Sequence, residues 1–348
     1  MQTAADAGDK QPLLILDRIE AFLDEHGLGR GPVRATRIGE GGGSNFTFLL
    51  ERHDGRWVLR RPPRPPLPPS AHDVVRESRL QLALHDAGFA RLPTIVAVCD
   101  DESLLGVPFY VMDWLDGDVV GERLPAAYDS PASRRALGLD LVDALVEIHS
   151  ADVRTPGLSA FARPGSYNER QTRRFAQLWE INKTRELPAV EEVGTWLGAH
   201  LPAPVAETVV HGDYRLGNTM LRDGRIAAVL DWEMGAIGDP RADVGYLLAT
   251  YSEPGGSPNP LGTSPVTAQD GFPSKAELVE RYRKRSGRDP GRLAWFEALA
   301  LWKAAVFCEA IYGRYVRGEL AAEDERAARF ELGVPYLADT AAALIEGG

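Results

Sequence analysis

Apolar and polar positions follow two different rhythms along the chain. In the first third, short apolar runs typical of strands occur at residues 46–50, 56–61, 94–98 and 108–112. From residue 131 onward, apolar residues recur every three or four positions, as they do on one face of a helix. The pattern predicts an α+β chain with a mainly β N-terminal part and a mainly helical C-terminal part. A length of 348 residues favours two lobes over one domain.

Two helices are expected among these strands. Residues 13–23 carry apolar side chains at helical spacing, and Gly27 follows as a C-terminal cap. A second helix is predicted from residue 70, with Ser70 as its N-cap. On that helix Glu77 shares a face with Leu80 and Leu84, so its carboxylate should turn toward the body of the protein and need a partner. A solvated glutamate on the helix surface is the alternative.

The C-terminal part predicts three further helices. A capping box at residues 274–277 opens one that ends at Gly287, and two more are expected around residues 295–315 and 321–330. Before them, residues 252–273 are rich in Gly, Pro, Ser and Thr, and they are too long for a simple connector. We expect either a mobile cover over a pocket or a disordered insertion.

A short hairpin is the most informative local feature. Two strand-like runs, residues 219–222 and 225–230, are joined by Asp223-Gly224, which strongly favours a two-residue type I′ turn. That turn would place Arg222 opposite Arg225 and therefore Asn218 opposite Val229.

Polar residues gather at the open end of this hairpin. With the predicted register, Asp231 lies one diagonal step from Asn218, about 7–8 Å. Two oxygen ligands at this spacing suit a hard cation such as Mg²⁺, which keeps its other positions for water and phosphate. Asp213, in the loop that enters the first strand, would lie beside the ion and could accept a proton from a hydroxyl nucleophile. The alternative is a polar turn between core strands.

His211-Gly212-Asp213, Asn218 five residues later, and Asp231 after an apolar strand together match the motif H-x-D-x-x-x-x-N with its following aspartate. This constellation resembles the protein-kinase-like fold, and most closely the aminoglycoside phosphotransferase family of small-molecule kinases. The resemblance implies that Asp213 is the catalytic base and that Asn218 and Asp231 hold Mg²⁺.

A glycine cluster precedes the first predicted hairpin of the chain. Gly41, Gly42 and Gly43, followed by Ser44 and Asn45, leave backbone N–H groups accessible to phosphate because no bulky side chain intervenes. The segment resembles the nucleotide loop of the family. It is no Walker P-loop, since no Gly-Lys-Ser/Thr follows, and an ordinary glycine-rich turn is the alternative.

The cation that usually pairs the α- and β-phosphates is not a lysine here, because none occurs between Lys10 and Lys183. Arg60 is the best substitute, since it shares a strand face with Val58, and the resemblance implies an ion pair between Arg60 and Glu77. A surface or structural arginine is the alternative. The string from Arg60 to Glu77 is also similar to one branch of the family, the kinase-like domains found alone or fused to acyl-CoA dehydrogenases.

The run after residue 108 resembles the segment that links the two lobes in this family. The resemblance implies that the backbone near Asp113 and Leu115 grips adenine, with Met112 behind it. An ordinary strand and turn is the alternative. The lobe boundary is therefore predicted here, giving an N-terminal nucleotide-binding lobe at 1–115 and a C-terminal catalytic and substrate-binding lobe at 116–348.

Two aspartates follow the metal motif in the run Gly-Asp-Pro-x-x-Asp. By resemblance, Asp239 and Asp243 support the catalytic loop rather than touch substrate. His149, at the end of a helical stripe, is expected to cap or pack. No Ala-Pro-Glu segment follows the metal loop, which counts against a protein kinase.

Composition narrows the possible partners. The formal net charge of −11 argues against nucleic acid or an anionic membrane surface. Cys99 and Cys308 are too few for a disulfide framework or a zinc site, which fits a reducing cytoplasm. The first ten residues lack the apolar core of a secretory signal, and charged Lys303 and Glu309 interrupt the most apolar later run.

These observations predict a two-lobe, protein-kinase-like α+β fold with a small, mainly β N-lobe and a larger, mainly helical C-lobe. The expected reaction moves the γ-phosphoryl of ATP, or of another nucleoside triphosphate, to a hydroxyl of a small molecule with Mg²⁺. A hydroxylated acyl compound or other metabolite is favoured as acceptor, and an aminoglycoside is the alternative. An alternative function of another class is a nucleotide-binding module with weak catalysis, which the arginine at position 60 suggests.

Overall fold

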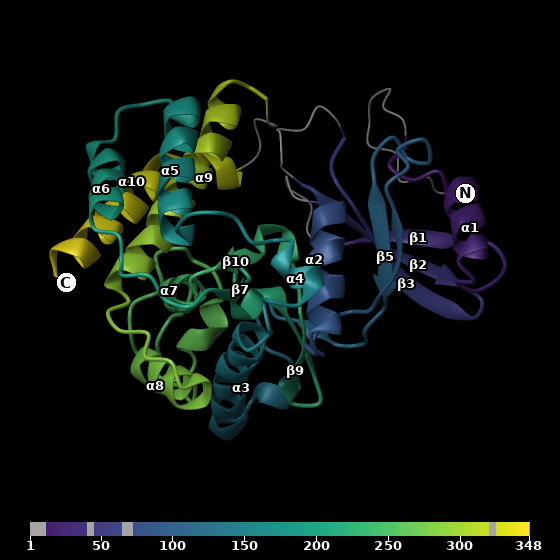
Figure 1. Ribbon diagram of the computed structural model, residues 1–348, viewed down its shortest axis with the longest axis horizontal. Coiled ribbons are helices and arrows are strands. Elements are labelled where there is room, and N and C mark those ends of the chain that lie inside the picture. The colour runs from purple at the N-terminus through teal and green to yellow at the C-terminus, as the bar shows by residue number, and fades with distance from the viewer. Residues whose placement is uncertain (1–11, 40–44, 65–71, 320–324, 348) are drawn as a thin grey trace. The chain divides into compact units, whose positions relative to one another are not determined.

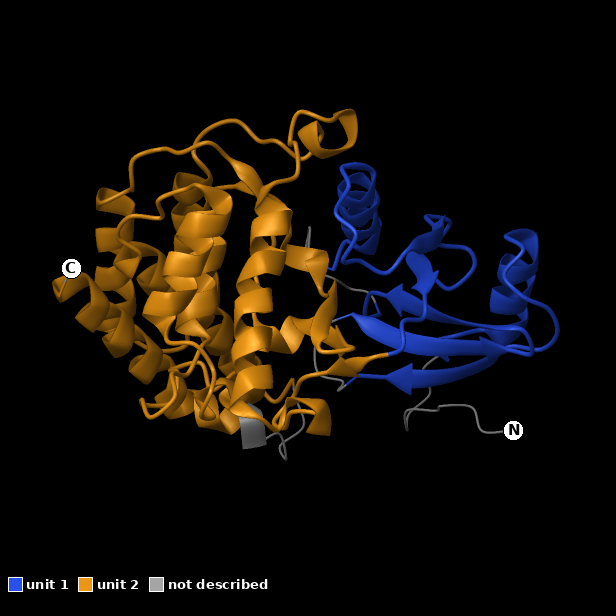
Figure 2. Ribbon diagram, turned by 90° about the horizontal axis from the view of Figure 1, so that it is seen from below, with its two compact units in different colours: residues 1–116 blue, residues 117–348 orange. Residues whose placement is uncertain are grey.

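The computed structural model describes residues 12–39, 45–64, 72–319 and 325–347. The chain divides into two compact units, Met1–Asp116 and Gly117–Gly348 (Figure 2). Unit 1 is mainly β and unit 2 is mainly helical, so the α+β class is as predicted. Within the described residues, no helix combines the length and the apolar composition needed to cross a membrane.

The described part of unit 1 is built on an antiparallel sheet of five strands in the order β1-β2-β3-β5-β4 (Figure 1). Its elements are α1 (Leu16–Glu25), β1 (Arg34–Ile38), β2 (Phe46–Arg52), β3 (Gly55–Arg61), α2 (Val74–Asp86), β4 (Ile95–Cys99) and β5 (Phe109–Asp113). Alternate side chains of the central strands, among them Phe48 and Leu59, face a core that α1 completes with Phe22 and Leu23. Each such side chain contributes roughly 1.5–3 kcal/mol when fully buried, which fixes the register of β3.

The second helix of unit 1 begins later than the sequence suggested. Its N-cap is Asp73, whose Oδ1 accepts the backbone N–H of Arg76 at 2.9 Å, and Ser70 lies outside the described residues. Both residue types cap helices well, and the sequence offered the two within one turn of each other. The shift leaves Glu77 on the buried face of α2, where it is 1% exposed.

Unit 2 surrounds two small sheets with helices. One sheet consists of the strands β6 (Asp118–Val119), β8 (Thr219–Arg222) and β9 (Arg225–Val229). The other sheet pairs β7 (Thr208–Val210) with β10 (Ala236–Gly238). The helices are α3 (Pro131–His149), α4 (Pro156–Ser159), α5 (Tyr167–Asn182), α6 (Pro188–Ala199), α7 (Arg241–Ala249), α8 (Lys275–Ser286), α9 (Ala294–Val316) and α10 (Glu325–Glu346). Short 3₁₀ turns lie at Ala126–Tyr128, Leu216–Asn218, Trp232–Met234 and Pro265–Ala268. Helix α9 packs against α5, α6, α7 and α10, so it forms the spine of this unit.

The segment at 252–273 is packed, unlike the disordered insertion that was one of the two predicted alternatives. Ser252, Asn259 and Thr267 are buried, and they hydrogen-bond one another across the loop: Asn259 Nδ2 donates to Ser252 Oγ at 2.8 Å, and Ser252 N donates to Thr267 Oγ1 at 2.9 Å. These internal hydrogen bonds hold Ser252, Asn259 and Thr267 together in a folded loop. Composition alone could not show this, because the same small polar residues also occur in disordered chains.

The last helix is longer than predicted because it continues through a proline. Pro335 has no N–H to give to the carbonyl of Glu331, which would normally end or kink a helix. Arg185 Nη1 donates to that carbonyl at 2.7 Å instead. The guanidinium is held in turn by the fully buried carboxylate of Glu309, with Arg185 Nη2 and Glu309 Oε2 at 3.1 Å. A side chain from the α5–α6 connection thus replaces the missing backbone donor.

This arrangement predicts a coupling between Arg185 and Pro335. Arg185→Met should lower the free energy of unfolding by about 3 kcal/mol, because it leaves Glu309 buried without its cation. In a Pro335→Ala background the new backbone N–H can bond to the carbonyl of Glu331, so the same change should cost about 1 kcal/mol less. A urea-denaturation double-mutant cycle measures the difference. Arg317→Met, which removes an exposed arginine of the same region, is the matched control, and strictly additive losses would contradict the coupling.

Candidate active site

The hairpin of unit 2 has the predicted turn. Asp223 and Gly224 both have positive φ, 52° and 78°, as a type I′ turn requires, and Arg222 lies opposite Arg225. Asp223 adopts this conformation readily because a short polar side chain tolerates the left-handed region.

The register at the open end of the hairpin differs from the prediction. A β-bulge leaves Ala227 without a partner, so Thr219 lies opposite Val229 and the prediction for Asn218 was wrong by one position. Asn218 pairs instead with Leu230, whose N–H donates to the carbonyl of Asn218 at 2.8 Å. The shift brings Asn218 beside the residue that directly precedes Asp231, rather than one diagonal step away.

Asn218 is fixed by Asp213. Its Nδ2 donates to the backbone carbonyl of Asp213 at 2.9 Å and to Asp213 Oδ2 at 2.7 Å. Both partners can only accept, so the amide must present its nitrogen here, and its Oδ1 turns away from them. Within the described chain Oδ1 takes part in no hydrogen bond, which leaves an oxygen of the type that Mg²⁺ prefers.

The Asp213 carboxylate is positioned but not saturated. Arg215 Nε lies 3.5 Å from Asp213 Oδ1, and the Asp213 side chain is 25% exposed. Oδ1 is buried and accepts no hydrogen bond from any residue that the structure describes. A carboxylate that is fixed through one oxygen and remains partly exposed can accept a proton from a hydroxyl group.

Asp231 has an unusual backbone conformation. Its φ of 66° and ψ of 61° lie in the left-handed region, which costs a non-glycine residue roughly 1–2 kcal/mol. The next residue, Trp232, is completely buried, and its Nε1 donates to the carbonyl of Val229 at 3.0 Å. Strain of this kind often accompanies functional positions.

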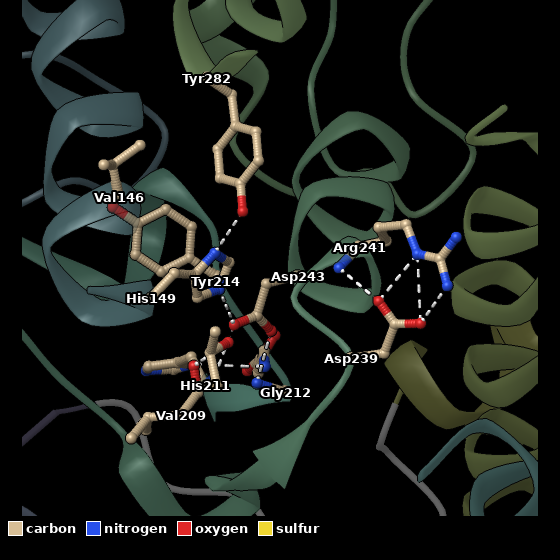
Figure 3. Close-up of polar contacts among 12 residues, drawn as sticks. Val146, His149, Val209, His211, Gly212, Tyr214, Asp239, Arg241, Asp243 and Tyr282 are labelled. Carbon is tan, nitrogen blue, oxygen red and sulfur yellow. Dashed lines mark hydrogen bonds and ion pairs between the residues drawn. The ribbon is translucent and has the colours of Figure 1, made fainter. Parts of the chain in front are cut away.

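Asp243, at the start of α7, holds the loop that carries Asp213 (Figure 3). Its Oδ2 accepts the N–H of His211 at 2.6 Å, and its Oδ1 accepts the N–H of Gly212 at 2.8 Å. His149 Nε2 lies 3.2 Å from the same Oδ2, and its Nδ1 lies 2.8 Å from the hydroxyl of Tyr282. Burial by itself would raise the pKa of Asp243, but the bond from His149 and the nearby donors outweigh it and lower the pKa. His149 is therefore a buried bridge, in keeping with its predicted packing role.

His211 is locked in one tautomer. Its Nε2 lies 2.8 Å from the carbonyl of Leu230, which can only accept, so Nε2 must carry the proton. Its Nδ1 then accepts the N–H of Asp213 at 3.2 Å. The ring thus ties the loop to the end of the hairpin, and it performs no proton transfer of its own in this arrangement.

Asp239 serves a different part of the same region. Its Oδ2 lies 2.6 Å from Arg241 Nη2 and accepts a bond from Asn168 Nδ2 at 2.9 Å. Figure 3 shows this pair apart from the contacts of Asp243. Asp239 therefore fixes the entry to α7, and only Asp243 contacts the loop directly.

Within unit 1, Arg60 and Glu77 form an ion pair. Arg60 Nε lies 3.1 Å from Glu77 Oε2, and the two side chains are 13% and 1% exposed. Tyr110 lies opposite Arg60 in the sheet, and its hydroxyl accepts a bond from Gln81 at 3.2 Å. Burial, followed by the charge of Glu77, raises the pKa of Tyr110 well above its ordinary value, so it remains a neutral phenol.

The neighbouring Arg61 has a structural use instead. It is 2% exposed and donates to the backbone carbonyls of Leu13 and Pro62. Burial, with a contribution from Arg64, lowers the pKa of Arg61 to about 10. Of the two arginines, Arg60 is thus the one that is paired with the helix carboxylate.

The predicted adenine-binding segment lies at the end of unit 1. Met112 pairs with Val58 across the sheet, and the N–H of Asp113 donates to the carbonyl of Thr94 at 2.9 Å. The Asp113 N–H is therefore used within the fold. The backbone N–H of Leu115 has no such bond within the described chain.

Part of the predicted nucleotide loop cannot be compared with the structure. Gly41, Gly42, Gly43 and Ser44 lie outside the described residues. Asn45 is described; it directly precedes β2 and is 8% exposed.

The sequence analysis overlooked two charged residues of unit 2. Arg215 stands inside the H-x-D-x-x-x-x-N motif at a position that the motif leaves open. Lys303 was noted only as a charge that interrupts an apolar run, yet it is buried in α9. A lysine within an otherwise apolar helix was a signal that could have marked it, because such a residue is rarely buried without a purpose.

A magnesium site can be tested against these residues. Among the described residues, no group of three or more His, Cys, Asp or Glu side chains could hold a metal ion. Asn218 Oδ1 and the Asp231 carboxylate are the protein oxygens in question, and Mg²⁺ commonly takes one or two of these with phosphate and water. The open amide oxygen of Asn218 fits such an ion.

Comparison with known proteins bears on the motif directly. The profile of the phosphotransferase enzyme family matches residues 35–296. The chain belongs to this family. The resemblance read from residues 211–231 is confirmed, and the match extends over both units.

The relatives of this chain also confirm the predicted branch. Acyl-CoA dehydrogenase family member 11 of Rattus norvegicus is 33% identical over 317 residues, which cover 88% of this chain and 40% of that protein. The chain thus spans well under half of the length of the curated relatives it matches.

Solved structures show the same fold. A crystal structure from Ralstonia eutropha, named for the aminoglycoside phosphotransferases, is 28% identical with a TM-score of 0.76, covering 94% of this chain and 98% of that one. A thermostable mutant of aminoglycoside phosphotransferase APH(4)-Ia, in a ternary complex with ADP and hygromycin B, is 15% identical with a TM-score of 0.60, covering 92% and 98%. The kinase-like fold predicted from the sequence is therefore confirmed.

Proposed function

We propose that this phosphotransferase uses ATP and Mg²⁺ to phosphorylate a hydroxyl group of a small molecule. The observation that carries the proposal is the geometry of Asp213, whose Oδ2 is held by Asn218 on a side chain that is 25% exposed. A positioned and partly exposed carboxylate is what proton transfer from an alcohol requires.

The reaction can be written with the residues that the chain supplies. Asp213 orients the acceptor hydroxyl and takes its proton as the oxygen bonds to the γ-phosphorus. The bond from that phosphorus to the β–γ bridging oxygen breaks, and ADP leaves with the electron pair. Asn218 and Asp231 would hold Mg²⁺, which when bound neutralises charge on the phosphates. Arg60, fixed by Glu77, would bind phosphate oxygens as a planar fork.

The remaining nucleotide contacts are part of the same proposal. The Asp113 carbonyl and the Leu115 N–H would meet the adenine edge, with Met112 behind it. Gly41 to Asn45 would supply backbone N–H groups to the phosphates. The complex of APH(4)-Ia with ADP supports a nucleotide in a protein of this fold.

The acceptor is proposed from the relatives. Their name, acyl-CoA dehydrogenase family member, favours a hydroxylated acyl compound or a related metabolite. The hygromycin B complex of APH(4)-Ia is the basis for the alternative, an aminoglycoside. The arginine at position 60 motivates a second candidate function, a nucleotide-binding module with weak catalysis, which would bind Mg²⁺ and ATP without acceptor-dependent turnover.

The metal role is tested with Asp231→Asn. Asparagine tolerates the left-handed backbone of this position, whereas alanine would add strain. Loss of the carboxylate charge should weaken Mg²⁺-dependent ADP binding about tenfold or more, a change of roughly 1.4 kcal/mol or above, and lower ADP release in turnover. Calorimetry with and without Mg²⁺ measures the first effect, and Asp86→Asn, an exposed aspartate of α2, is the control. Unchanged Mg²⁺ dependence in Asp231→Asn would remove this residue from the metal site.

A further inference from the structure

Helix α9 carries two buried charges that are treated very differently. Glu309 is completely buried, and it accepts bonds from the N–H and hydroxyl of Thr184 and from Arg185. Lys303, almost two turns earlier, is 8% exposed and forms no hydrogen bond or ion pair with any residue that the structure describes. Its ammonium instead lies 4.8 Å from the centre of the Phe175 ring.

An uncompensated buried cation destabilises a fold. Removing an ammonium group from water costs several kcal/mol unless a partner repays it, and an apolar residue of similar size would be more stable here. This destabilisation of the charged form lowers the pKa of Lys303: burial, assisted by the charge of Arg174, brings it to about 8. Apart from the face of the Phe175 ring, no described group is bonded to this charge, and buried groups of this kind are candidates for binding sites.

Helix α9, which carries Lys303, packs against α7, and Asp243 of α7 holds the loop of Asp213. The charges of Asp243 and then of Asp213 act on Lys303 and oppose the lowering of its pKa. The charge of Asp213, after burial, raises the pKa of Tyr246 on α7, and Cys308 of α9 adds to that effect. Asp213, Tyr246, Cys308 and Lys303 are therefore electrostatic neighbours although they come from three segments of the chain.

The charges of this neighbourhood are unevenly balanced. Asp213 is already paired with Arg215 at 3.5 Å. Arg174, the residue before Phe175 on α5, is exposed and, like Lys303, forms no ion pair within the described chain. Lys303 and Arg174 thus form no ion pair within the described chain, whereas Asp213 lies beside Arg215 and Asp243 beside His149. We therefore expect the two cations to attract an anion rather than an aminoglycoside-like cation.

We propose that Lys303 binds an anionic group of the acceptor, a carboxylate or a phosphate, while Asp213 receives the proton of its hydroxyl. Arg174 adds a second positive charge at the exposed side of the same site. The inference rests on the proposed function and narrows it from any hydroxylated small molecule to one that carries a negative charge.

The first test uses acceptors in matched pairs. The pairs are 3-hydroxybutyrate with its methyl ester and glycerol 3-phosphate with glycerol, and hygromycin B is added as a cationic acceptor. Acceptor-dependent ADP release should favour the anionic member of a pair about tenfold or more in kcat/KM, which corresponds to one buried charge-assisted contact. Lys303→Met should abolish that preference and Lys303→Arg should retain it.

The control is Lys284→Met, which removes an exposed lysine of α8 that is paired with Glu280. This variant should behave as the wild type does. Lys303→Met should be no less stable to heat than the wild type, because it removes a buried charge. Preference for the neutral or cationic acceptors, or an anion preference that survives in Lys303→Met, would overturn the inference.

A binding measurement tests whether Lys303 binds an anion even if every chosen acceptor proves too small for turnover. With Mg²⁺ and AMP-PNP present, calorimetry should detect sulfate binding to the wild type and to Lys284→Met, and about tenfold weaker binding to Lys303→Met. Equal sulfate binding by all three proteins, or no sulfate binding by the wild type, contradicts the role of Lys303 but leaves the proposed function intact. Failure of the wild type to bind Mg²⁺ and AMP-PNP would instead contradict the proposed function.

Discussion

Asp213→Asn is expected to lower the rate of phosphoryl transfer by on the order of 10²–10⁴-fold, the usual contribution of a positioned general base. The amide has nearly the shape of the carboxylate, and its oxygen can still accept the bond that Asn218 Nδ2 now donates to Asp213 Oδ2. It cannot accept a proton from the acceptor hydroxyl. Binding of Mg²⁺ and nucleotide should therefore persist while turnover falls, and calorimetry together with an ADP-release assay measures both.

The control for this variant is Asp223→Asn. Asp223 occupies the exposed hairpin turn with a φ of 52°, a conformation that asparagine adopts equally well. The stability and turnover of this variant should therefore stay within experimental error of the wild type. A thermal melt shows whether Asp213→Asn keeps its fold. Full turnover in a folded Asp213→Asn protein would refute the assignment of the base.

The motif residues could be predicted because they are close together in the chain. Asp213, Asn218 and Asp231 fall within 19 residues, and the Asp-Gly turn determined how the two strands meet. The error in register came from the bulge at Ala227, which has no glycine or other marker in the sequence. Local spacing therefore identified the residues, but not which of them face each other.

Interactions between distant segments were predictable only where a known pattern linked them. The pair of Arg60 and Glu77 was inferred from a strand face, a helix face and the resemblance to kinases, and the structure places the two groups 3.1 Å apart. No such pattern connects Arg185 with the carbonyl of Glu331, so the continuation of α10 through Pro335 was not expected. Such contacts are decided by packing that a single sequence does not reveal.

Lys303 illustrates a third situation. Its charge was visible in the sequence, but an interruption in an apolar run is ordinarily explained by a helix that turns one side to water. Burial on α9, beside Phe175 and without a partner in the described chain, gives the same residue another meaning. Whether a charge is solvated or buried depends on the neighbours of the helix, and these are long-range.

Asp243→Asn should have the second large effect, because it acts on the loop that positions the base. Asp243 accepts two backbone N–H groups and a bond from His149, whereas an amide presents only one oxygen and turns an NH₂ group toward a donor. Breaking this buried set should cost about 3 kcal/mol of unfolding free energy, a large part of the roughly 5–15 kcal/mol that stabilise a domain. Turnover should fall about 10²-fold, since a displacement of about 1 Å in a positioning loop has effects of that size.

The pH dependence of unfolding separates this explanation from a simple packing defect. The pKa of Asp243 is lowered from 3.8 in the folded protein, so its stabilising contribution is complete above that value and is lost as the pH falls through the lower folded pKa. The gap in stability between wild type and Asp243→Asn should therefore be widest near neutral pH and narrow below about pH 4. Urea titrations at both pH values measure it, with Asp223→Asn again as the matched substitution. A gap that stays constant across this range would mean that the ionised carboxylate is not what holds the loop of His211 and Gly212.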